Sequence, residues 1–128
     1  MISEEIDELI MGQVLTASAG QNPARQTAIK AGLSNEKTAY VINQVCGSGL
    51  RSVAAGYQAI MSNDSKVVIA GGQESMTNAP HAINFRNGQK LEESKLIDTM
   101  IKDGLWDAFN GYHMGTVSYT HLTLPTKA

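Results

Sequence analysis

Residues 44–50 read Gln-Val-Cys-Gly-Ser-Gly-Leu, and this stretch organises the interpretation of the whole chain. Cys46, the only cysteine among 128 residues, stands where an apolar, strand-like stretch gives way to small residues and then to a helical pattern. α/β folds often place a nucleophile at such a strand-to-helix turn, because the backbone N–H groups that begin the helix favour a negatively charged sulfur. The stretch therefore predicts that any chemistry of this protein takes place at Cys46.

Apolar runs and helical patterns alternate on both sides of this turn. Three apolar runs predict strands, and the last of them is continuous, as in sheets buried on both faces. They cover residues 6–15, 38–46 and 66–70. Asn22 is a good N-cap and Pro23 suits the first helical position, while Gly32 suits the residue past the end. These signals predict a helix over residues 23–31. The alternation of strands with helices predicts an α/β fold with a parallel sheet.

A second helix is predicted directly after the cysteine turn. Ser48 can cap its start, and Asn63 and Asp64 end it. Apolar side chains recur along it at the three- and four-residue spacing of one buried helical face. They are Leu50, Val53, Ala54, Tyr57, Ile60 and Met61.

The alternation of strands and helices stops after Gly72. Residues 73–102 are interpreted as a long excursion from the core, and loops of this length are usually functional or lie at an interface. Near its end, apolar residues between Ser94 and Gly104 predict a short amphipathic helix. They are Leu96, Ile97, Met100 and Ile101. A cluster of aromatic and apolar residues with a turn inside it follows, made of Leu105, Trp106, Phe109, Tyr112 and Met114 around Asn110 and Gly111.

Composition and charge argue against several classes of protein. With 42% hydrophobic and 17% charged residues, the chain is too apolar to be disordered. A net charge of -2 and the lack of a basic patch argue against binding to nucleic acid or to an anionic membrane. The longest apolar runs fall well short of the roughly 20 residues that span a bilayer. No set of His, Cys, Asp and Glu has metal-ligand spacing, and a single cysteine fits a reducing, cytoplasmic compartment.

Each candidate site residue also has a structural interpretation. A lone cysteine is often a small buried hydrophobe, although the glycines on both sides of Ser48 allow a ligand to approach the backbone. Residues 71–72, Gly-Gly, lack the spacing of a phosphate-binding loop, so a strand end packed closely against another backbone is favoured. Glu74 is either a site carboxylate or an ordinary loop residue. His113 is either a base or ligand contact, or a structural histidine between an aromatic residue and a methionine.

Five segments, in order and consistently spaced, resemble the thiolase family, and most of all its biosynthetic branch, the acetyl-CoA C-acetyltransferases. They read Gly-Gln-Asn-Pro-Ala-Arg-Gln over 20–26, Asn-Gln-Val-Cys-Gly-Ser-Gly-Leu over 43–50, Val-Ile-Ala-Gly-Gly-Gln-Glu-Ser-Met over 68–76, Met-Ile-Lys-Asp-Gly-Leu-Trp-Asp-Ala-Phe over 100–109 and Tyr-His-Met-Gly over 112–115. The resemblance covers residues 2–116. It implies a partial layered α/β fold: three strands of a mostly parallel sheet, helices and the long excursion.

The resemblance implies an acyltransferase that forms acetoacetyl-CoA from two acetyl-CoA, or cleaves it. Cys46 matches the cysteine of the family that takes the acyl group as a thioester. Leu105, His113 and Met114 match positions near the pantetheine and acyl end of bound CoA. CoA thioesters are then the substrates, with no further cofactor and no metal. The excursion over 73–102 would cover the active site and help tetramers form, since the parent protein is expected to be a homodimer or homotetramer.

Departures from the family pattern predict a fragment. The family's second half supplies an Asn-Glu-Ala-Phe stretch, a Gly-His-Pro histidine that deprotonates the nucleophile, and a Cys-x-Gly-Gly-Gly cysteine that acts as acid and base. None of these occurs in the 128 residues. Residues 117–128 do not continue the family pattern and are expected to be a non-native tail. An earlier strand of the family is expected to sit between this chain's own strands, and its loss would leave edges open and favour aggregation.

Three functional hypotheses follow. In the first, Cys46 is the nucleophile of an acyltransferase whose activity belongs to the intact parent protein. In the second, the chain is a truncated, catalytically inactive fragment with no function of its own. The third, a decarboxylating or condensing synthase of the wider thiolase-like superfamily, is disfavoured by the match over 100–114.

Overall fold

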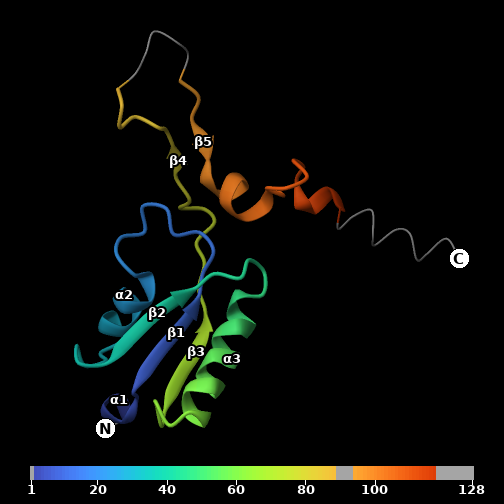
Figure 1. The fold of residues 1–128 in the computed structure, drawn as a ribbon. Helices are drawn as coiled ribbons and strands as arrows, with labels where there is room; N and C mark the ends of the chain where they lie inside the picture. Colours follow the sequence, from blue (N-terminus) through green and yellow to red (C-terminus); the bar gives the residue numbers. More distant parts are fainter. Residues whose placement is uncertain (1, 89–93, 118–128) are drawn as a thin grey trace, which may run out of the picture. The chain divides into compact units, whose positions relative to one another are not determined.

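A computed structural model describes residues 2–88 and 94–117 of the chain. The chain divides into two compact units, residues 1–75 and 76–128. The first unit, coloured blue to yellow-green in Figure 1, alternates helices and strands. Its elements are α1 (Ile2–Glu5), β1 (Glu8–Gly12), α2 (Pro23–Lys30), β2 (Thr38–Ile42), α3 (Ser48–Met61) and β3 (Val68–Gly72). The predicted α/β fold with three strands is confirmed.

β1 is the central strand of a parallel sheet with the order β2-β1-β3. Gly12 of β1 is aligned with Ile42 of β2 and with Gly72 of β3, so the carboxyl ends of the three strands meet at one edge. The expectation that a missing strand separates this chain's own strands is wrong, because β1 pairs directly with both of its neighbours.

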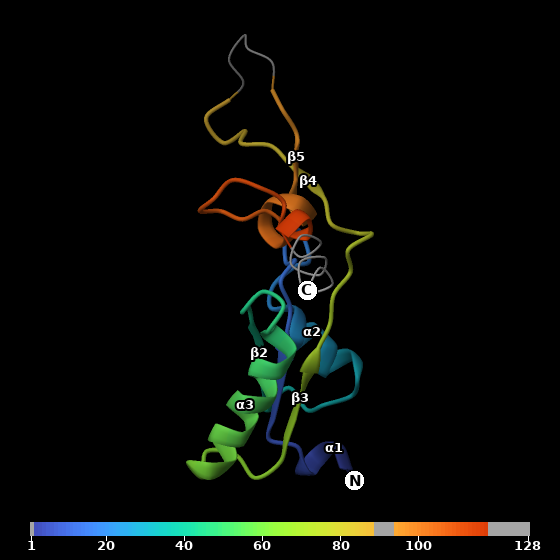
Figure 2. The same cartoon turned by 90° about the vertical axis from the view of Figure 1, so that its right-hand side faces the viewer.

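The two longer helices cover opposite faces of β1, because successive side chains of a strand point to opposite sides of the sheet. Leu9 lies on the side of α2 and belongs to an apolar core with Ala28 and Leu33. Ile10 and Gly12 point to the other side, where Ile10 is fully buried and Gly12 contacts the first turn of α3. Figures 1 and 2 show α2 and α3 on either side of the strands.

α2 begins at the predicted residue and ends one residue earlier than predicted. The Asn22 side chain accepts a hydrogen bond from the Arg25 N–H at 3.1 Å, which satisfies one of the free donors at the helix start. Gly32 follows the helix with a φ of 87°, a conformation that glycine adopts without strain. The Arg25 guanidinium donates to the carbonyls of Asn35 and Lys37, so it also fixes the loop between α2 and β2.

α3 packs on the sheet through small residues and not through the predicted apolar face. Its buried residues are Ser48, Ser52 and Gly56. A Cβ on Gly56 would lie 3.1 Å from Val68 Cγ1 of β3, so the helix lies about as close to the strand as a glycine permits. Of the six residues predicted to be buried, Ala54 is half-buried. The other five are exposed, namely Leu50, Val53, Tyr57, Ile60 and Met61.

The second and third strands differ from prediction in their ends and their burial. β2 stops at Ile42, because a tight turn begins before Cys46. β3 begins at Val68 and runs through Gly72, and its Ile69 is 40% exposed. A strand buried on both faces is therefore the wrong description, since α3 covers one face of β3 while α2 lies against β1 and β2.

A carboxylate joins β1 to β3 at the amino end of the sheet. The Asp7 side chain accepts hydrogen bonds from the N–H groups of Lys66 (2.7 Å) and Val67 (3.0 Å). The Asp7 N–H in turn donates to the Val67 carbonyl at 2.9 Å. These backbone donors, helped by the nearby Lys37 ammonium, lower the pKa of the Asp7 carboxyl.

The second unit contains a short antiparallel strand pair, β4 (His81–Ala82) with β5 (Ile97–Asp98), and a π-helix, η1 (Ile101–Leu105) (Figure 1). Thr99 closes the strand pair by donating both its N–H and its hydroxyl to the Pro80 carbonyl. The predicted helix that included residues 96–101 is therefore displaced, since Ile97 lies in β5 and the helical turns come after it.

Two features of the domain organisation stay predictions. The first unit ends at Ser75, close to the predicted start of the excursion over 73–102, of which residues 89–93 lie outside the described residues. Of the expected non-native tail over 117–128, all but Val117 also lie outside the described residues.

Candidate active site

Cys46 lies in the turn that connects β2 to α3, with an exposed side chain. The alternative of a small buried hydrophobe is therefore wrong. α3 begins two residues later, has Gly47 as its N-cap and runs for 14 residues. The backbone N–H groups in the first turn of a helix carry partial positive charge, which stabilises a nearby anion. The structure thus confirms the predicted strand-to-helix turn at Cys46 and shows that its thiol is exposed to solvent.

The residue before Cys46 has an unusual backbone conformation. Val45 has a φ of 48°, in the left-handed region that β-branched residues rarely adopt. Such a conformation costs on the order of 1–3 kcal/mol and persists only where the surroundings fix it. The Asn43 side chain contributes by accepting a hydrogen bond from the Val45 N–H at 3.0 Å. The surrounding contacts therefore hold Val45, in the turn that carries the thiol, in a backbone conformation that valine disfavours.

Ser48 also fixes this turn, and it does so from a buried position. Its Oγ accepts a hydrogen bond from the Gln44 N–H at 2.8 Å and donates one to the Val45 carbonyl at 2.6 Å. Ser48 was predicted to cap α3, but the side chain bonds backward into the turn and the helix has no side-chain cap. The N–H groups at the start of α3 are therefore not occupied by a capping side chain.

Glycines let the first turn of α3 approach the carboxyl edge of the sheet. A Cβ on Gly12 would lie 2.4 Å from the Ser48 carbonyl carbon and 2.5 Å from the Gly49 nitrogen. A Cβ on Gly72 would lie 3.4 Å from the Gly12 carbonyl oxygen and 3.6 Å from Gly49 Cα. The structural interpretation of residues 71–72, a strand end close to another backbone, is confirmed.

Glu74 serves the loop that follows β1. Its two carboxylate oxygens accept hydrogen bonds from the N–H groups of Val14 and Leu15, at 3.0 and 2.9 Å. These contacts favour the interpretation of Glu74 as an ordinary loop residue over that of a site carboxylate. Beside it, Gln73 accepts a hydrogen bond from the Thr27 hydroxyl and donates one to the Gln13 side chain. These contacts join β1, α2 and the end of β3, and no sequence motif pointed to them.

In the second unit, a tight turn groups the three residues predicted to bind substrate. Trp106 and His113 form an antiparallel bridge, so Leu105 and Met114 flank the two ends of the same turn. The Asp107 N–H donates to the Tyr112 carbonyl at 2.8 Å and closes the turn. Leu105, His113 and Met114 are thus neighbours in the fold of this unit, although the first two are eight positions apart in the sequence.

The His113 ring is oriented by a backbone donor. Its Nδ1 accepts a hydrogen bond from the Gly115 N–H at 3.0 Å, so the neutral ring carries its proton on Nε2. A Cβ on Gly115 would lie 3.0 Å from the same Nδ1, so the lack of a side chain at this position leaves room for the imidazole ring. His113 can therefore offer a hydrogen bond from Nε2 to an acceptor on a ligand.

The tip of this turn is more exposed than the predicted aromatic cluster implied. The Asp107 carboxylate accepts hydrogen bonds from the Asn110 side chain and from the N–H groups of Asn110 and Phe109, which lower the pKa of the Asp107 carboxyl. Phe109 is 98% exposed. The turn at Asn110 is confirmed, but the aromatic residues around it do not form a closed cluster.

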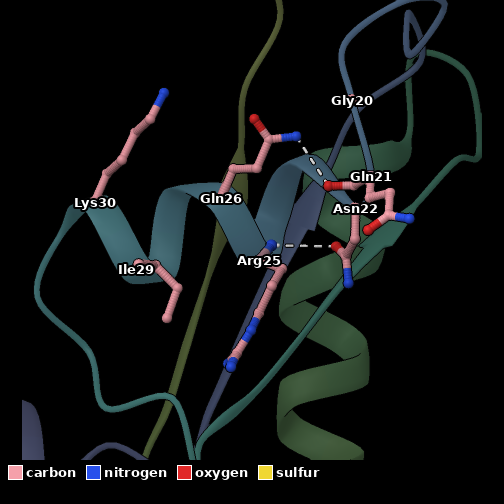
Figure 3. Close-up of a pocket in the computed structure, with 7 residues that line it drawn as sticks. All are labelled: Gly20, Gln21, Asn22, Arg25, Gln26, Ile29 and Lys30. Atoms are coloured by element: carbon pink, nitrogen blue, oxygen red, sulfur yellow. Dashed lines mark hydrogen bonds between the residues drawn. The ribbon is translucent and has the colours of Figure 1, made fainter.

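A shallow hollow of about 630 Å³ lies along α2 and the loop that precedes it. Figure 3 shows the residues that line it, including Gln26, Ile29 and Lys30. The Gln26 amide donates to the Ala19 and Gln21 carbonyls, so this polar side chain is already used by the loop before the helix. None of the predicted site residues lines the hollow.

Over residues 2–88 and 94–117, the structure holds no group of three or more His, Cys, Asp or Glu side chains placed to bind a metal ion. Within the same ranges, no helix has the length and apolar character needed to cross a membrane.

His81, which had no evident partner in the sequence, faces the Asp98 carboxylate across β4 and β5, with 3.9 Å between Nε2 and Oδ2. This pair follows from strand register, which the sequence did not predict.

The structure is an α/β fold with an exposed cysteine at the start of a helix. The chain matches the family described as "Thiolase, N-terminal domain" over residues 2–123. It therefore belongs to the thiolase family. The match extends seven residues beyond the predicted end of the family-like segment at residue 116.

Individual relatives agree with this assignment. The chain is 62% identical to an acetyl-CoA acetyltransferase of Paracoccus denitrificans over 114 residues, which are 89% of this chain and 29% of that protein. It is 64% identical to an acetyl-CoA acetyltransferase of Rhizobium meliloti over 111 residues, 87% of this chain and 28% of that one. A crystal structure of an Ascaris suum thiolase in complex with coenzyme A superimposes with a TM-score of 0.88 at 34% identity, over 97% of this chain and 32% of that one. The chain thus spans under a third of the length of these proteins.

Proposed function

We propose that this chain is the nucleophile-bearing part of an acetyl-CoA acetyltransferase, with Cys46 as the residue that accepts the acyl group. The observation that supports this most is the exposed Cys46 thiol at the amino end of α3. The names of the relatives from Paracoccus denitrificans and Rhizobium meliloti support the choice of acetyl-CoA as substrate.

The reaction has two halves. In the first, the Cys46 thiolate attacks the carbonyl carbon of an acyl-CoA, a new thioester forms at Sγ, and CoA leaves as a thiolate. In the second, an acetyl-CoA that has lost a proton from its methyl carbon attacks the acyl-enzyme, forming acetoacetyl-CoA and restoring the cysteine. The reverse direction is thiolysis. Exchange of one thioester for another suits a cysteine, because the attacking and leaving groups are alike.

The substrate-binding residues belong to the second unit. We propose that Leu105 and Met114 contact the pantetheine and acyl end of the CoA thioester. The Nε2–H of His113 would donate a hydrogen bond to a carbonyl oxygen of the same ligand. Support comes from the turn that brings these residues together and from the Gly115 N–H that orients the imidazole. A homodimer or homotetramer of the whole protein belongs to this proposal.

Thiolysis provides the test of the proposed function. The full chain is mixed with acetoacetyl-CoA and CoA, and the loss of the 3-ketoacyl absorbance is followed against Cys46→Ser. The general bases that the resemblance implies are absent from these 128 residues, so we expect an absorbance loss that stops at one equivalent per Cys46, with no continued turnover. No loss beyond that of Cys46→Ser would support the alternative, a chain without acyl-transfer activity of its own.

A further inference from the structure

We propose that Ser48 is a positioning residue for Cys46, acting through two hydrogen bonds that fix the turn on which the thiol is carried. The inference rests on the proposed role of Cys46 as nucleophile. It assigns to Ser48 a role distinct from helix capping, since the Ser48 hydroxyl bonds within the turn before the helix.

Both hydrogen bonds of the Ser48 hydroxyl end on the two residues directly before Cys46. The hydroxyl oxygen accepts from the Gln44 N–H while its proton goes to the Val45 carbonyl, so one side chain closes a ring around the turn. A hydroxyl can make these two bonds at once because it has one proton and two lone pairs. Ser48 is 4% exposed, so no water replaces this hydroxyl readily.

The position of Ser48 is itself fixed by the sheet. Its backbone lies so close to Gly12 of β1 that a Cβ at position 12 would clash with it. The strained Val45 is thereby tied, through the Ser48 hydroxyl, to a buried residue that is packed against the central strand. Ser48→Ala keeps the hydrogen bond from the Ser48 N–H to the Val45 carbonyl (3.1 Å) but loses both bonds of the hydroxyl. Val45 is then less firmly held in its left-handed conformation, and Cys46, the next residue, moves with it.

Ser52 provides the matched control on the same helix. It is also buried, and its hydroxyl lies within hydrogen-bond distance of the carbonyls of Gly49 (2.6 Å) and Gly71 (2.7 Å). Neither carbonyl belongs to a residue that precedes Cys46 in the turn. Replacing either serine by alanine removes one buried hydroxyl and lowers stability. Only the replacement of Ser48 removes hydrogen bonds to the two residues before Cys46.

The test uses alkylation of the full chain by iodoacetamide, which reports on Cys46 alone because the chain has one cysteine. It needs no CoA substrate, so it is independent of whether the chain transfers acyl groups. At neutral pH we expect Ser48→Ala to slow alkylation about two- to fivefold, because the thiolate loses its place at the helix start. Ser52→Ala should keep the wild-type rate. In Val45→Gly/Ser48→Ala most of the rate should return, since glycine adopts the left-handed conformation without help.

Equal rates for Ser48→Ala and wild type, or equal slowing by Ser48→Ala and Ser52→Ala, would overturn the inference. Hydrogen exchange on the wild-type chain gives a second test that does not depend on how the variants fold. The Gln44 amide, which donates to Ser48 Oγ, should exchange more slowly than the Cys46 amide. Equal exchange at the two amides would contradict the inference as well.

Discussion

The two faces of α3 differ in a way that reverses the usual amphipathic helix. The face on the sheet consists of small residues, Ser48, Ser52 and Gly56, while the outer face carries large apolar side chains such as Leu50 and Tyr57, which are 77% and 65% exposed. α2, on the other side of β1, also buries small residues, but these are the apolar Ala24 and Ala28. Helical periodicity thus located an apolar stripe on α3 correctly but assigned it to the wrong side, because close approach to the sheet selects for size as well as polarity.

The largest predicted effect tests the close approach on the inner face. Gly12→Ala would place a methyl group within 2.5 Å of the α3 backbone, which has to move. Overpacking of this kind costs about 3 kcal/mol or more when backbone must shift. The free energy of unfolding from urea titration measures it. Gly49→Ala is the control, because no atom lies within 4 Å of its added Cβ, and it should change stability by no more than about 1 kcal/mol.

An intermediate effect concerns the polar contact on the same inner face. Ser52→Ala should lower the free energy of unfolding by about 1 kcal/mol, because it removes a buried hydrogen bond to backbone carbonyls on α3 and β3. Thermal unfolding of both proteins under identical conditions measures the loss. An unchanged or higher stability would mean that the polarity of this face is incidental and that only its small size matters.

Lowering the pH tests the contribution of Asp7, which lies at the amino end of the sheet, opposite the edge that carries Gly12 and Gly72. Because the folded protein lowers the pKa of Asp7, its charged form adds stability above the unfolded pKa of about 3.9. That stability is lost as pH falls through the lowered folded value. Asp7→Asn should therefore flatten the acid limb of a stability-against-pH curve for the first unit. Asp107→Asn removes a carboxyl whose pKa is also lowered but which belongs to the second unit. It should leave the acid limb of the first unit's curve unchanged.

The smallest effect on stability is expected on the outer face of α3. Tyr57→Lys and Met61→Lys should change the free energy of unfolding by less than about 0.5 kcal/mol, because both side chains are exposed. The same changes should reduce self-association, measured by sedimentation velocity, since they break up an exposed apolar stripe. A loss of stability like that of Gly12→Ala would show that the outer face is packed in solution.

The sequence predicted well those features that local chemistry decides. Asn22 and Gly32 located the ends of α2, and the change of pattern at Cys46 located the start of α3. It could not predict that Ser48 bonds backward, because a serine at a helix start is equally suited to capping. Nor could it predict the direct pairing of β1 with β3, or His81 opposite Asp98, since strand order and register depend on contacts between distant residues.

The proposed role of Cys46 is tested most directly by mapping the acetyl group after incubation with acetyl-CoA. The full chain and Cys46→Ser are digested under acidic conditions that preserve thioesters, and the peptides are identified by mass spectrometry. We predict an acetyl group on the peptide that contains Cys46, removable by hydroxylamine and missing from Cys46→Ser. An acetyl group found elsewhere, or equally in both proteins, would contradict the assignment of Cys46 as the acyl acceptor.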